Sequence, residues 1–478
     1  MSIKRNFIYN SVLTVSGYVF TLLTYPYVSR VLGLSNIGIV NFVDGLINYF
    51  ILFAMMGTTT LGIREIAINK SDKDKLSKAF SGILLLNGIT TLLAIIVLLI
   101  SIHTVPQLIP HKNILYIGVC KLIFNLFLTE WFFTGIENFA YITKRSIAIK
   151  LFYMVSVFLF IRKPADFQLY YLLCVLTVMI NGIVNIIYSH KYVMFTLKGI
   201  HIKPYLNTFF SVGLYIIISS MYTSFNIAWL GMAAGTDEVG YYTTATKFHA
   251  IILALLSAFQ NVMFPRVTSL LSEGKTTEYI EKLKISVDSL LAFCIPTIII
   301  SIIFGPDILH LLVGDGFEGS YLPFRIIMPL ILIIGYEQII CIQVLLAMKQ
   351  ERKLLHNSCL GAFVGLLLNF IIVKNLGAVG SSLVWLSSEL AVMVGAQYLV
   401  FKTAHFSFPW KMFSKYSLTY LPAVIVLLGI YQYCNYSDII VITIAMIFTA
   451  AYTIVVQIKI LKNTIFLQLF QRVFSHNM

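Results

Sequence analysis

Tyr25-Pro-Tyr-Val-Ser-Arg-Val-Leu-Gly-Leu-Ser-Asn-Ile-Gly-Ile-Val-Asn-Phe42 joins the first long apolar segment of the chain to the second and carries Arg30 at the join. Its glycine pattern returns later, because Gly33-x-x-x-Ile-Gly38 is matched by Gly235-x-x-x-Val-Gly240. The same offset of 202 positions relates Arg64 to Arg266, the charged residues that follow the next apolar segment. All these pairs fall at equivalent points of two similar hydropathy patterns. We therefore interpret the chain as two copies of one membrane unit.

Composition supports a membrane protein. The 478 residues are 59% hydrophobic and 11% charged, with a mean hydropathy of +0.88, whereas soluble proteins have roughly 25% charged residues. Apolar runs of about 20 residues recur along the chain, and each is long enough to cross a hydrocarbon core about 30 Å thick. The first run, 7–30, is too long for a secretory signal and lacks a small-residue cleavage site. We expect an all-α, polytopic membrane protein that keeps this first helix.

Hydropathy predicts fourteen membrane helices, with twelve as the alternative if the last two do not span the bilayer. The predicted spans are 7–30, 39–63, 79–102, 113–136, 141–161, 167–189, 207–231, 240–264, 286–305, 322–348, 355–373, 379–401, 417–434 and 438–458. This pattern predicts a six-helix lobe at 1–190, a cytoplasmic linker at 191–206 and a second six-helix lobe at 207–405. Two extra helices and a cytoplasmic tail follow at 406–478.

The basic residues are distributed unevenly between the two sides of the membrane. If Lys4 and Arg5 are cytoplasmic, the loops on that side hold 26 of the 34 lysines and arginines, Arg472 in the tail included. This asymmetry predicts that both termini are cytoplasmic. The net charge of +14 is then explained by membrane orientation rather than by binding to nucleic acid. Because both lobes start on the same side, we expect a pseudo-twofold axis along the membrane normal.

Signatures of an enzyme are absent from the sequence. There is no GxSxG, HExxH or Walker A motif, and no loop exceeds about 25 residues, which leaves no room for a catalytic domain. The six cysteines occur singly in apolar segments without a CxxC, so we interpret them as packing residues rather than metal ligands or disulfides. We expect neither an enzyme nor a bound metal or organic cofactor. His103, His111 and His310 would suit a membrane glycosyltransferase or polymerase, but such enzymes generally need a larger loop.

Charged side chains within apolar spans are the candidates for function, because each costs roughly 2.5–3.5 kcal/mol to insert. Such a residue snorkels to the interface, pairs with a neighbour or lines a polar pathway. Lys121 and Glu130 are nine residues apart, so they lie on opposite faces of a helix and need separate partners. Arg30, at the outer end of its helix, is in a position to pair with Asp44. The full set within spans is Asp44, Lys121, Glu130, Lys247, Asp288, Glu337 and Glu389.

Two cations are placed to meet an anionic ligand. Lys247 lies about 12 Å below the outer end of its predicted helix, near the middle of the bilayer, where snorkelling is hardest. Arg30 belongs to the first helix pair of the other copy. Both side chains suit a phosphate better than a cationic drug. Tyrosine, serine, threonine and asparagine side chains at 219–226 and 241–246 suit sugar hydroxyls, although such groups also hold membrane helices together.

Three motifs carry a resemblance to a known family. They are Glu130-Trp-Phe-Phe-Thr-Gly-Ile-Glu-Asn-Phe-Ala-Tyr-Ile-Thr-Lys-Arg-Ser146, Pro26-Tyr-Val-Ser-Arg-Val-Leu-Gly33 with Asn6-x-x-x-Asn10, and Gly377-Ala-Val-Gly-Ser-Ser382. Together they resemble the O-antigen repeat-unit flippases, in the polysaccharide-transport branch of the multidrug/oligosaccharidyl-lipid/polysaccharide exporter superfamily. The resemblance covers the first twelve predicted helices, and the Trp-Phe-Phe-Thr-Gly-Ile-Glu run is its most specific part. The two extra helices are similar to those of the lipid II flippases.

The resemblance implies a bacterial inner-membrane transporter that acts in lipopolysaccharide biosynthesis. Such a transporter moves an undecaprenyl-pyrophosphate-linked oligosaccharide from the cytoplasmic to the periplasmic leaflet by alternating access. It implies a cationic site for the pyrophosphate, at Arg30 by motif and at Lys121, Lys247 and Arg266 by chemistry. Coupling to H⁺ or Na⁺, or helix register, is expected of the acidic residues Asp44, Glu130, Glu137, Glu337 and Glu389. A cation-coupled multidrug exporter and a lipid II flippase are the rivals within the superfamily. From the expected pathway of polymer assembly, we also expect a polysaccharide polymerase and a chain-length regulator as partners.

Overall fold

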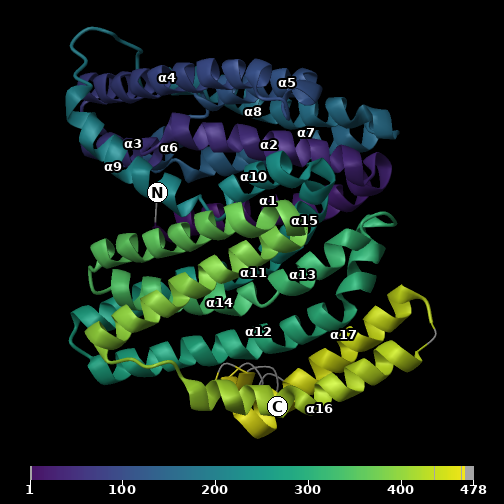
Figure 1. The fold of residues 1–478 in the computed structure, drawn as a ribbon. Coiled ribbons are helices and arrows are strands. Elements are labelled where there is room, and N and C mark those ends of the chain that lie inside the picture. Colours follow the sequence, from purple (N-terminus) through teal and green to yellow (C-terminus); the bar gives the residue numbers. More distant parts are fainter. Residues whose placement is uncertain (1–2, 435, 465, 469–478) are drawn as a thin grey trace. The chain divides into compact units, whose positions relative to one another are not determined.

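The computed structural model describes residues 3–434, 436–464 and 466–468, which form helices and connections without a β-strand. The end of the predicted tail, 469–478 with Arg472, lies outside the described residues. By their contacts the residues form two units, Met1–Thr243 and Thr244–Met478, and the boundary falls inside one long helix, α11 (Thr236–Ser272). Figure 1 shows the order of the helices along the chain. The all-α architecture agrees with the sequence analysis.

Among its described residues, the first unit contains ten α-helices, two short 3-10 helices and the beginning of α11. Within it, α2 packs against α4, α5 and α10, while α1 packs against α7 and α5 against α8. Helix α2 is thus the central helix of this unit. The bounds are α1 Ile3–Leu32, α2 Leu34–Met55, α3 Thr58–Asn69, α4 Lys73–Thr104, α5 Lys112–Asn125, α6 Glu130–Gly135, α7 Phe139–Phe160, α8 Phe167–Ser189, α9 Lys203–Ser219 and α10 Ser224–Ala234.

The second unit is organised around α12 and α15. Helix α12 packs against α14, α16 and α17, and α15 packs against α13, α14 and the π-helical segment that follows α14. The bounds are α12 Thr276–Val313, α13 Tyr321–Ile327, α14 Leu330–Gln338, the π-helix Ile339–Leu346, α15 Glu351–Ala404, α16 Trp410–Tyr433, α17 Asp438–Val455 and a second π-helix Val456–Leu461.

The repeated glycines have matching backbone geometry. Gly33, before α2, has φ 76° and ψ 169°, and Gly235, between α10 and α11, has φ 100° and ψ 169°. A positive φ of this kind is accessible to glycine and strained for other residues, which explains why glycine occupies both corners. The copies also meet, because the Asn41 amide donates to the Thr243 hydroxyl at 2.8 Å, and these two residues are again 202 positions apart. The repeat seen in sequence is therefore a repeat of local structure.

Several predicted spans are interrupted. The span 39–63 is divided at Met56–Gly57 into α2 and α3, and 113–136 is divided between α5 and α6. The span 207–231 is bent by 52° between α9 and α10. The spans 355–373 and 379–401 are joined in α15, with non-helical φ/ψ angles at Gly377 between them. Hydropathy averages over such breaks, which are set by packing and not by the local polarity of the chain.

The predicted count of fourteen helices stays a prediction. Within the described residues, nine helices are long and apolar enough to cross a membrane, or ten if the bent pair α9 and α10 is one span. The joined helices of α15 enter that count as one. The lobe boundaries at 190 and 207 also stay a prediction, since the division by contacts falls at Thr243 instead.

The predicted linker lies against α4. The backbone N–H of Met194 donates to the Ser77 hydroxyl at 3.1 Å, and that of Thr196 donates to the Ser81 hydroxyl at 3.0 Å. Helix α4 itself begins at an N-cap, Asp72, whose carboxylate accepts the backbone N–H groups of Asp74 and Lys75. The hydrogen bond from Lys75, followed by that from Asp74, lowers the pKa of the Asp72 carboxyl. The linker is therefore attached to a helix whose first turn is well capped.

The two extra helices are attached to α12 by a polar network and an apolar cluster. Asp288 on α12 accepts the Tyr416 hydroxyl at 2.7 Å and the Asn463 amide at 2.7 Å, and the Tyr416 oxygen lies 3.0 Å from the Gln457 side-chain oxygen. Nearer the other end of α12, an apolar cluster comprises Ile303, Phe304, Leu427, Val441 and Ala445. Asp288, which the sequence left open between an interfacial charge and a paired one, is thus hydrogen-bonded within the unit.

We predict that Gly38→Ala destabilises the protein by about 1–3 kcal/mol, the usual range for overpacking a close contact. A Cβ at position 38 would overlap the backbone carbonyl oxygen of Thr236, which cannot move without displacing the start of α11. Thermal unfolding in detergent measures the effect. Gly429→Ala, on α16, is the control because a Cβ there meets nothing within 4 Å. Equal melting temperatures for the two variants would contradict the prediction.

Candidate functional site

A half-buried ion pair joins two helices of the first unit. The Lys121 ammonium on α5 donates to the Asp44 carboxylate on α2 at 2.6 Å and to the Asn48 side-chain oxygen at 2.8 Å. Asn48 in turn donates to Asp44 at 3.0 Å. The side chain of Lys121 is 14% exposed and that of Asp44 33% exposed. We call these three residues the Lys121 cluster.

Local sequence explains why the Lys121 cluster forms. Gly118 lies one turn before Lys121 on α5, and a Cβ there would approach the Ile47 side chain of α2 to 2.6 Å. The missing side chain therefore lets the two backbones come close together. Asp44 and Asn48 are four residues apart and share one face of α2. A lysine on the facing turn of α5 can consequently reach both oxygens.

The pairing corrects one expectation and agrees with another. Asp44 was expected to be available to Arg30, but its partner is Lys121. Arg30 is exposed in the last turn of α1. Lys121 and Glu130 do have separate partners, although the reason differs from the one expected, because the helix between them ends at Asn125 and restarts at Glu130.

Glu130 belongs to a second ionic cluster of the first unit. Its carboxylate accepts the Arg145 guanidinium at 2.6 Å, and the same guanidinium donates to the Asn185 side-chain oxygen and, at 3.0 Å, to the Ser146 hydroxyl. The Arg145 side chain is only 5% exposed, whereas that of Glu130 is 50% exposed. Arg145, which the family motif contains, is therefore a buried charge. Its charge fixes the packing of α6, α7 and α8.

The aromatic run of the motif is part of the core. Trp131, Phe132 and Phe133 are buried, and Phe80 of α4 packs against the first two, with ring centroids 5.6 Å and 5.0 Å away. Gly62 of α3 faces the Trp131 ring without a side chain of its own. The most specific part of the motif therefore positions helices and does not line an open site.

Glu137 ends the motif at a surface corner. It has a positive φ of 61°, and its carboxylate pairs with Lys70 at 3.0 Å, with side-chain exposures of 53% and 50%. A pair as exposed as this contributes little to stability. The geometry places Glu137 away from any buried cluster of the described residues and gives it a role in the corner between α6 and α7.

The remaining predicted residues lie in the second unit. Lys247 and Arg266 are both on α11, and Arg266 is exposed. Glu337 on α14 and Glu389 on α15 lie on two helices that pack against each other, and Glu389 is buried. Sequence reasoning selected all four residues but did not show that the helices carrying the two acids pack together. It missed Asn48 and Asn185. Asn48 could have been found as an amide one turn after Asp44, and Asn185 as an amide within an apolar span.

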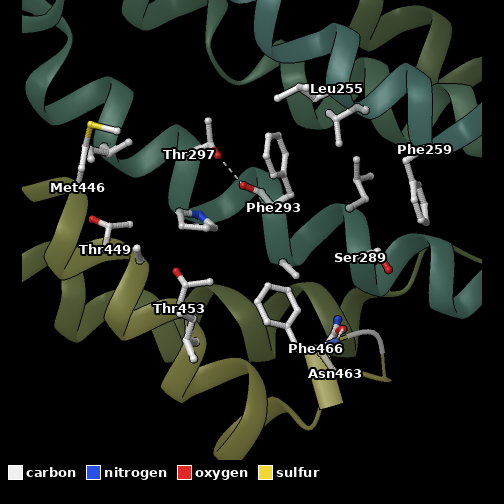
Figure 2. A pocket seen from close by; sticks show the side chains of 17 residues that line it. Leu255, Phe259, Ser289, Phe293, Thr297, Met446, Thr449, Thr453, Asn463 and Phe466 are labelled. Atoms are coloured by element: carbon white, nitrogen blue, oxygen red, sulfur yellow. Dashed lines mark hydrogen bonds between the residues drawn. The ribbon is translucent and has the colours of Figure 1, made fainter. Parts of the chain in front are cut away.

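The second unit also contains an apolar cavity of about 610 Å³ between α11, α12 and α17. Figure 2 shows Leu255 and Phe259 of α11 on one side and Met446 of α17 on another. The polar groups in its wall are uncharged, for example Thr449 and Asn463. No acidic or basic side chain lines this cavity among the described residues, so it suits a hydrocarbon chain rather than a sugar or phosphate.

Comparison with solved structures defines the class of the fold. The structure is similar to the lipid II flippase MurJ in an inward closed conformation, with a TM-score of 0.77 over 96% of this chain and 100% of that one, at 16% identity. It is also similar to an outward-facing multidrug resistance MATE family transporter of the MOP superfamily, with a TM-score of 0.56 over 84% of this chain and 96% of that one, at 14% identity. The chain thus has the fold of polytopic membrane transporters.

Comparison of sequences identifies the family. Residues 3–271 match the sequence model of the family described as "Polysaccharide biosynthesis protein", and the chain belongs to this family. A "Putative O-antigen transporter" of Escherichia coli K12 is 25% identical over 82% of this chain and 95% of that protein. A "Probable low-salt glycan biosynthesis flippase Agl15" of Haloferax volcanii is 23% identical over 40% of this chain and 41% of that protein. The family expected from the sequence motifs is confirmed.

We predict strong energetic coupling between Lys121 and Asp44. Lys121→Met or Asp44→Asn alone leaves a charge without its partner, whereas the double variant leaves neither charge, so the double variant loses less stability than the sum of the two single ones by about 1–3 kcal/mol. Thermal or denaturant unfolding of the four proteins in detergent measures this difference.

The control cycle uses Lys78→Met and Asp74→Asn. This pair has the same 2.6 Å separation, but its side chains are 41% and 72% exposed. Its coupling should stay below about 1 kcal/mol, as is usual for exposed ion pairs. A coupling at Lys121 no larger than this control would show that the cluster contributes nothing through its burial.

Proposed function

We propose that this protein is a transporter that flips an undecaprenyl-pyrophosphate-linked oligosaccharide repeat unit, of O-antigen or a similar surface polysaccharide, from the cytoplasmic to the periplasmic leaflet. The observation that carries the proposal is the Lys121 cluster, a charged polar site held among apolar helices in a member of a polysaccharide biosynthesis family. Relatives named as an O-antigen transporter and a glycan flippase support the same function. The cycle would be one of alternating access in the bacterial inner membrane, with both termini cytoplasmic.

Lys121 is suited to an anionic ligand even though it is paired. An ammonium has three N–H donors, and the contacts to Asp44 and Asn48 use two of them. A phosphate oxygen arriving at the third donor would compete with Asp44 for the positive charge. The ion pair would therefore hold Lys121 in place while the site is empty and release part of its charge to the substrate. Arg30, Lys247 and Arg266 are the further cations that we propose for the pyrophosphate.

The lipid part of the substrate needs an apolar environment. An isoprenoid chain left in the bilayer requires no binding site, and we keep this as the simplest arrangement. The uncharged cavity beside α17 could receive a segment of the chain that lies next to the protein. Only the pyrophosphate and the sugars would then have to be shielded from hydrocarbon during translocation.

The rival functions differ in the charge that the substrate must carry. A multidrug exporter for cations would need an acidic binding region, whereas the proposal needs a basic one. A lipid II flippase would use the same pyrophosphate chemistry with a different sugar and peptide. A glycosyltransferase or polymerase would need residues that position an acceptor outside the membrane, and the longest connection between described helices is only 190–202. The named relatives are transporters, which agrees with a protein that is not an enzyme.

Two further proposals follow from the expected pathway. Transport would draw energy from H⁺ or Na⁺ through one or more of Asp44, Glu130, Glu337 and Glu389, or from consumption of the product in the periplasmic leaflet. A polysaccharide polymerase and a chain-length regulator would act on that product. Direct binding to either partner would be an additional property, and the lipid-linked oligosaccharide is the partner that the transport function itself requires.

Complementation of a deletion strain tests the function. We expect the strain to accumulate lipid-linked repeat unit on the cytoplasmic side, and wild-type protein to restore surface glycan. Arg30→Ala or Lys247→Ala should lower surface glycan by about tenfold or more, because a hydrogen bond to a charged group contributes about 1.5–3 kcal/mol.

Lys163→Ala is the matched control, since Lys163 is exposed in the connection before α8. It should restore glycan fully when produced at the same level. Two results would count against the proposal. If the repeat unit reaches the periplasmic leaflet without this protein, the transport function is wrong. If Arg30→Ala and Lys247→Ala both act like Lys163→Ala, the proposed cationic site is wrong.

A further inference from the structure

A second cavity of the second unit lies where the chain passes from α15 to α16. One face of α12 and the connection between those two helices enclose about 740 Å³, and we call this space the connection groove. It shares no lining residue with the uncharged cavity beside α17, so it is a separate site. Its lining includes Tyr279, Leu283, Lys284, Val287 and the segment 404–412.

The floor of the connection groove is apolar and continues deeper along α12. A narrower cavity of about 190 Å³ shares the buried Val287 with it and is lined further along α12 by Leu290 and Leu291, with no charged side chain among the described residues. From Lys284 to Leu291 the helix rises about 10 Å, and the predicted span 286–305 begins two residues after Lys284. The two cavities together form an apolar path that leads from the membrane surface inward.

The connection is held in place by packing and by a hydrogen bond. The Phe408 ring lies edge-on to the Tyr336 ring of α14, with centroids 5.0 Å apart, and its centroid is 4.5 Å from that of the Trp410 ring. The Gln397 amide of α15 donates to the Phe406 carbonyl oxygen at 2.8 Å. The wall of the connection groove is therefore a packed part of the unit.

Two lysines lie at the mouth of the connection groove. Lys284 of α12 and Lys411 of α16 line it and are exposed, and both belong to connections that the sequence assigns to the cytoplasmic side. Neither forms an ion pair with an acidic side chain among the described residues. At about 100° per residue, the residues of α12 that line the groove span about 140°, and Glu278 and Glu281 lie outside this arc. The mouth is therefore positively charged.

This distribution of charge matches an anionic phospholipid. A phosphate at the mouth would meet the two ammonium groups, whose alkyl stems lie along apolar surface, and an acyl chain would follow the apolar path. Trp410 is 67% exposed at the boundary between the two regions, where tryptophan is enriched in membrane proteins. A zwitterionic lipid would bring a further positive charge beside the lysines, so a lipid with a net negative charge is favoured. Basic pockets on the cytoplasmic side of membrane proteins bind lipids of this kind.

We propose that the connection groove binds one anionic phospholipid of the cytoplasmic leaflet, with its phosphate at Lys284 and Lys411 and an acyl chain along α12. The bound lipid joins α12 to the start of α16 and covers the apolar floor. The protein's own tail is a poorer occupant, because 469–478 contains Arg472 and no acidic residue. The lipid-linked substrate also carries phosphate, but transport removes it from this leaflet, whereas phospholipid surrounds the protein throughout. This site does not depend on the proposed transport function.

Quenching of tryptophan fluorescence locates the lipid. Trp410 is exposed, whereas Trp131, Trp229 and Trp385 are buried or half-buried. For the full-length protein in detergent, phosphatidylglycerol brominated on its acyl chains should quench the fluorescence at a concentration about tenfold lower than brominated phosphatidylcholine does, because two lysines attract its charge. In Trp410→Phe, which keeps an aromatic ring, this additional quenching should be lost.

A double variant tests the charge at the mouth. Lys284→Gln with Lys411→Gln should weaken binding of phosphatidylglycerol about tenfold and leave binding of phosphatidylcholine unchanged. Lys198→Gln with Lys203→Gln is the matched control, since both lysines are exposed in or beside the predicted linker, and it should bind phosphatidylglycerol like the wild-type protein. All four side chains are exposed, so we expect both variants to fold, and thermal unfolding checks this.

Three results would overturn the proposal. Equal quenching by the two brominated lipids would indicate only the ordinary lipid layer around the protein. Equal losses in the two double variants would indicate attraction to the basic surface as a whole. If undecaprenyl pyrophosphate displaces brominated phosphatidylglycerol at a lower concentration than unlabelled phosphatidylglycerol does, the groove is a site for the lipid-linked substrate and not for a phospholipid.

Discussion

The dependence of buried charge on a partner governs the interior of this protein. An ionised side chain among apolar helices is stable only when it is paired or neutralised. The first unit uses pairing, since Lys121 meets Asp44 and Arg145 meets Glu130. In the second unit Asp288 accepts the Tyr416 hydroxyl and the Asn463 amide, so hydrogen bonds take the place of an ion pair. The charged residues thus select which helices must lie together.

Small residues make those contacts possible. Gly118 lets α5 approach α2, and Gly38 lets the beginning of α11 approach the same helix. The glycine corners at Gly33 and Gly235 then set the direction in which each repeated helix leaves. Packing of this kind is the main source of helix association in a bilayer, where apolar side chains gain little from leaving the lipid. The repeat in the sequence is accordingly most visible at glycines rather than at charged residues.

The family motif divides into parts with different physical roles. Trp131, Phe132 and Phe133 fill the core of the first unit, and Glu137 forms an exposed pair at a corner. Glu130 and Ser146 contact the buried guanidinium of Arg145, which also belongs to the motif. A motif that identifies a family can therefore consist largely of residues that hold helices in place. The residues that we assign to the substrate lie mostly outside it, where chemistry rather than pattern suggested them.

The sequence by itself determined the membrane class, the all-α fold, the repeat and the family, because hydropathy and glycine corners are properties of neighbouring residues in the chain. It also selected Asp44, Lys121 and Glu130 as charges that need a partner, since each is costly in hydrocarbon. Only the tertiary structure decided their partners: Asp44 with Lys121 rather than Arg30, Arg145 as a buried charge, and Asp288 with Tyr416 and Asn463. The breaks at Met56 and before Glu130 were likewise beyond hydropathy. Such contacts join residues tens of positions apart, and packing, which a linear pattern does not encode, decides which of them meet.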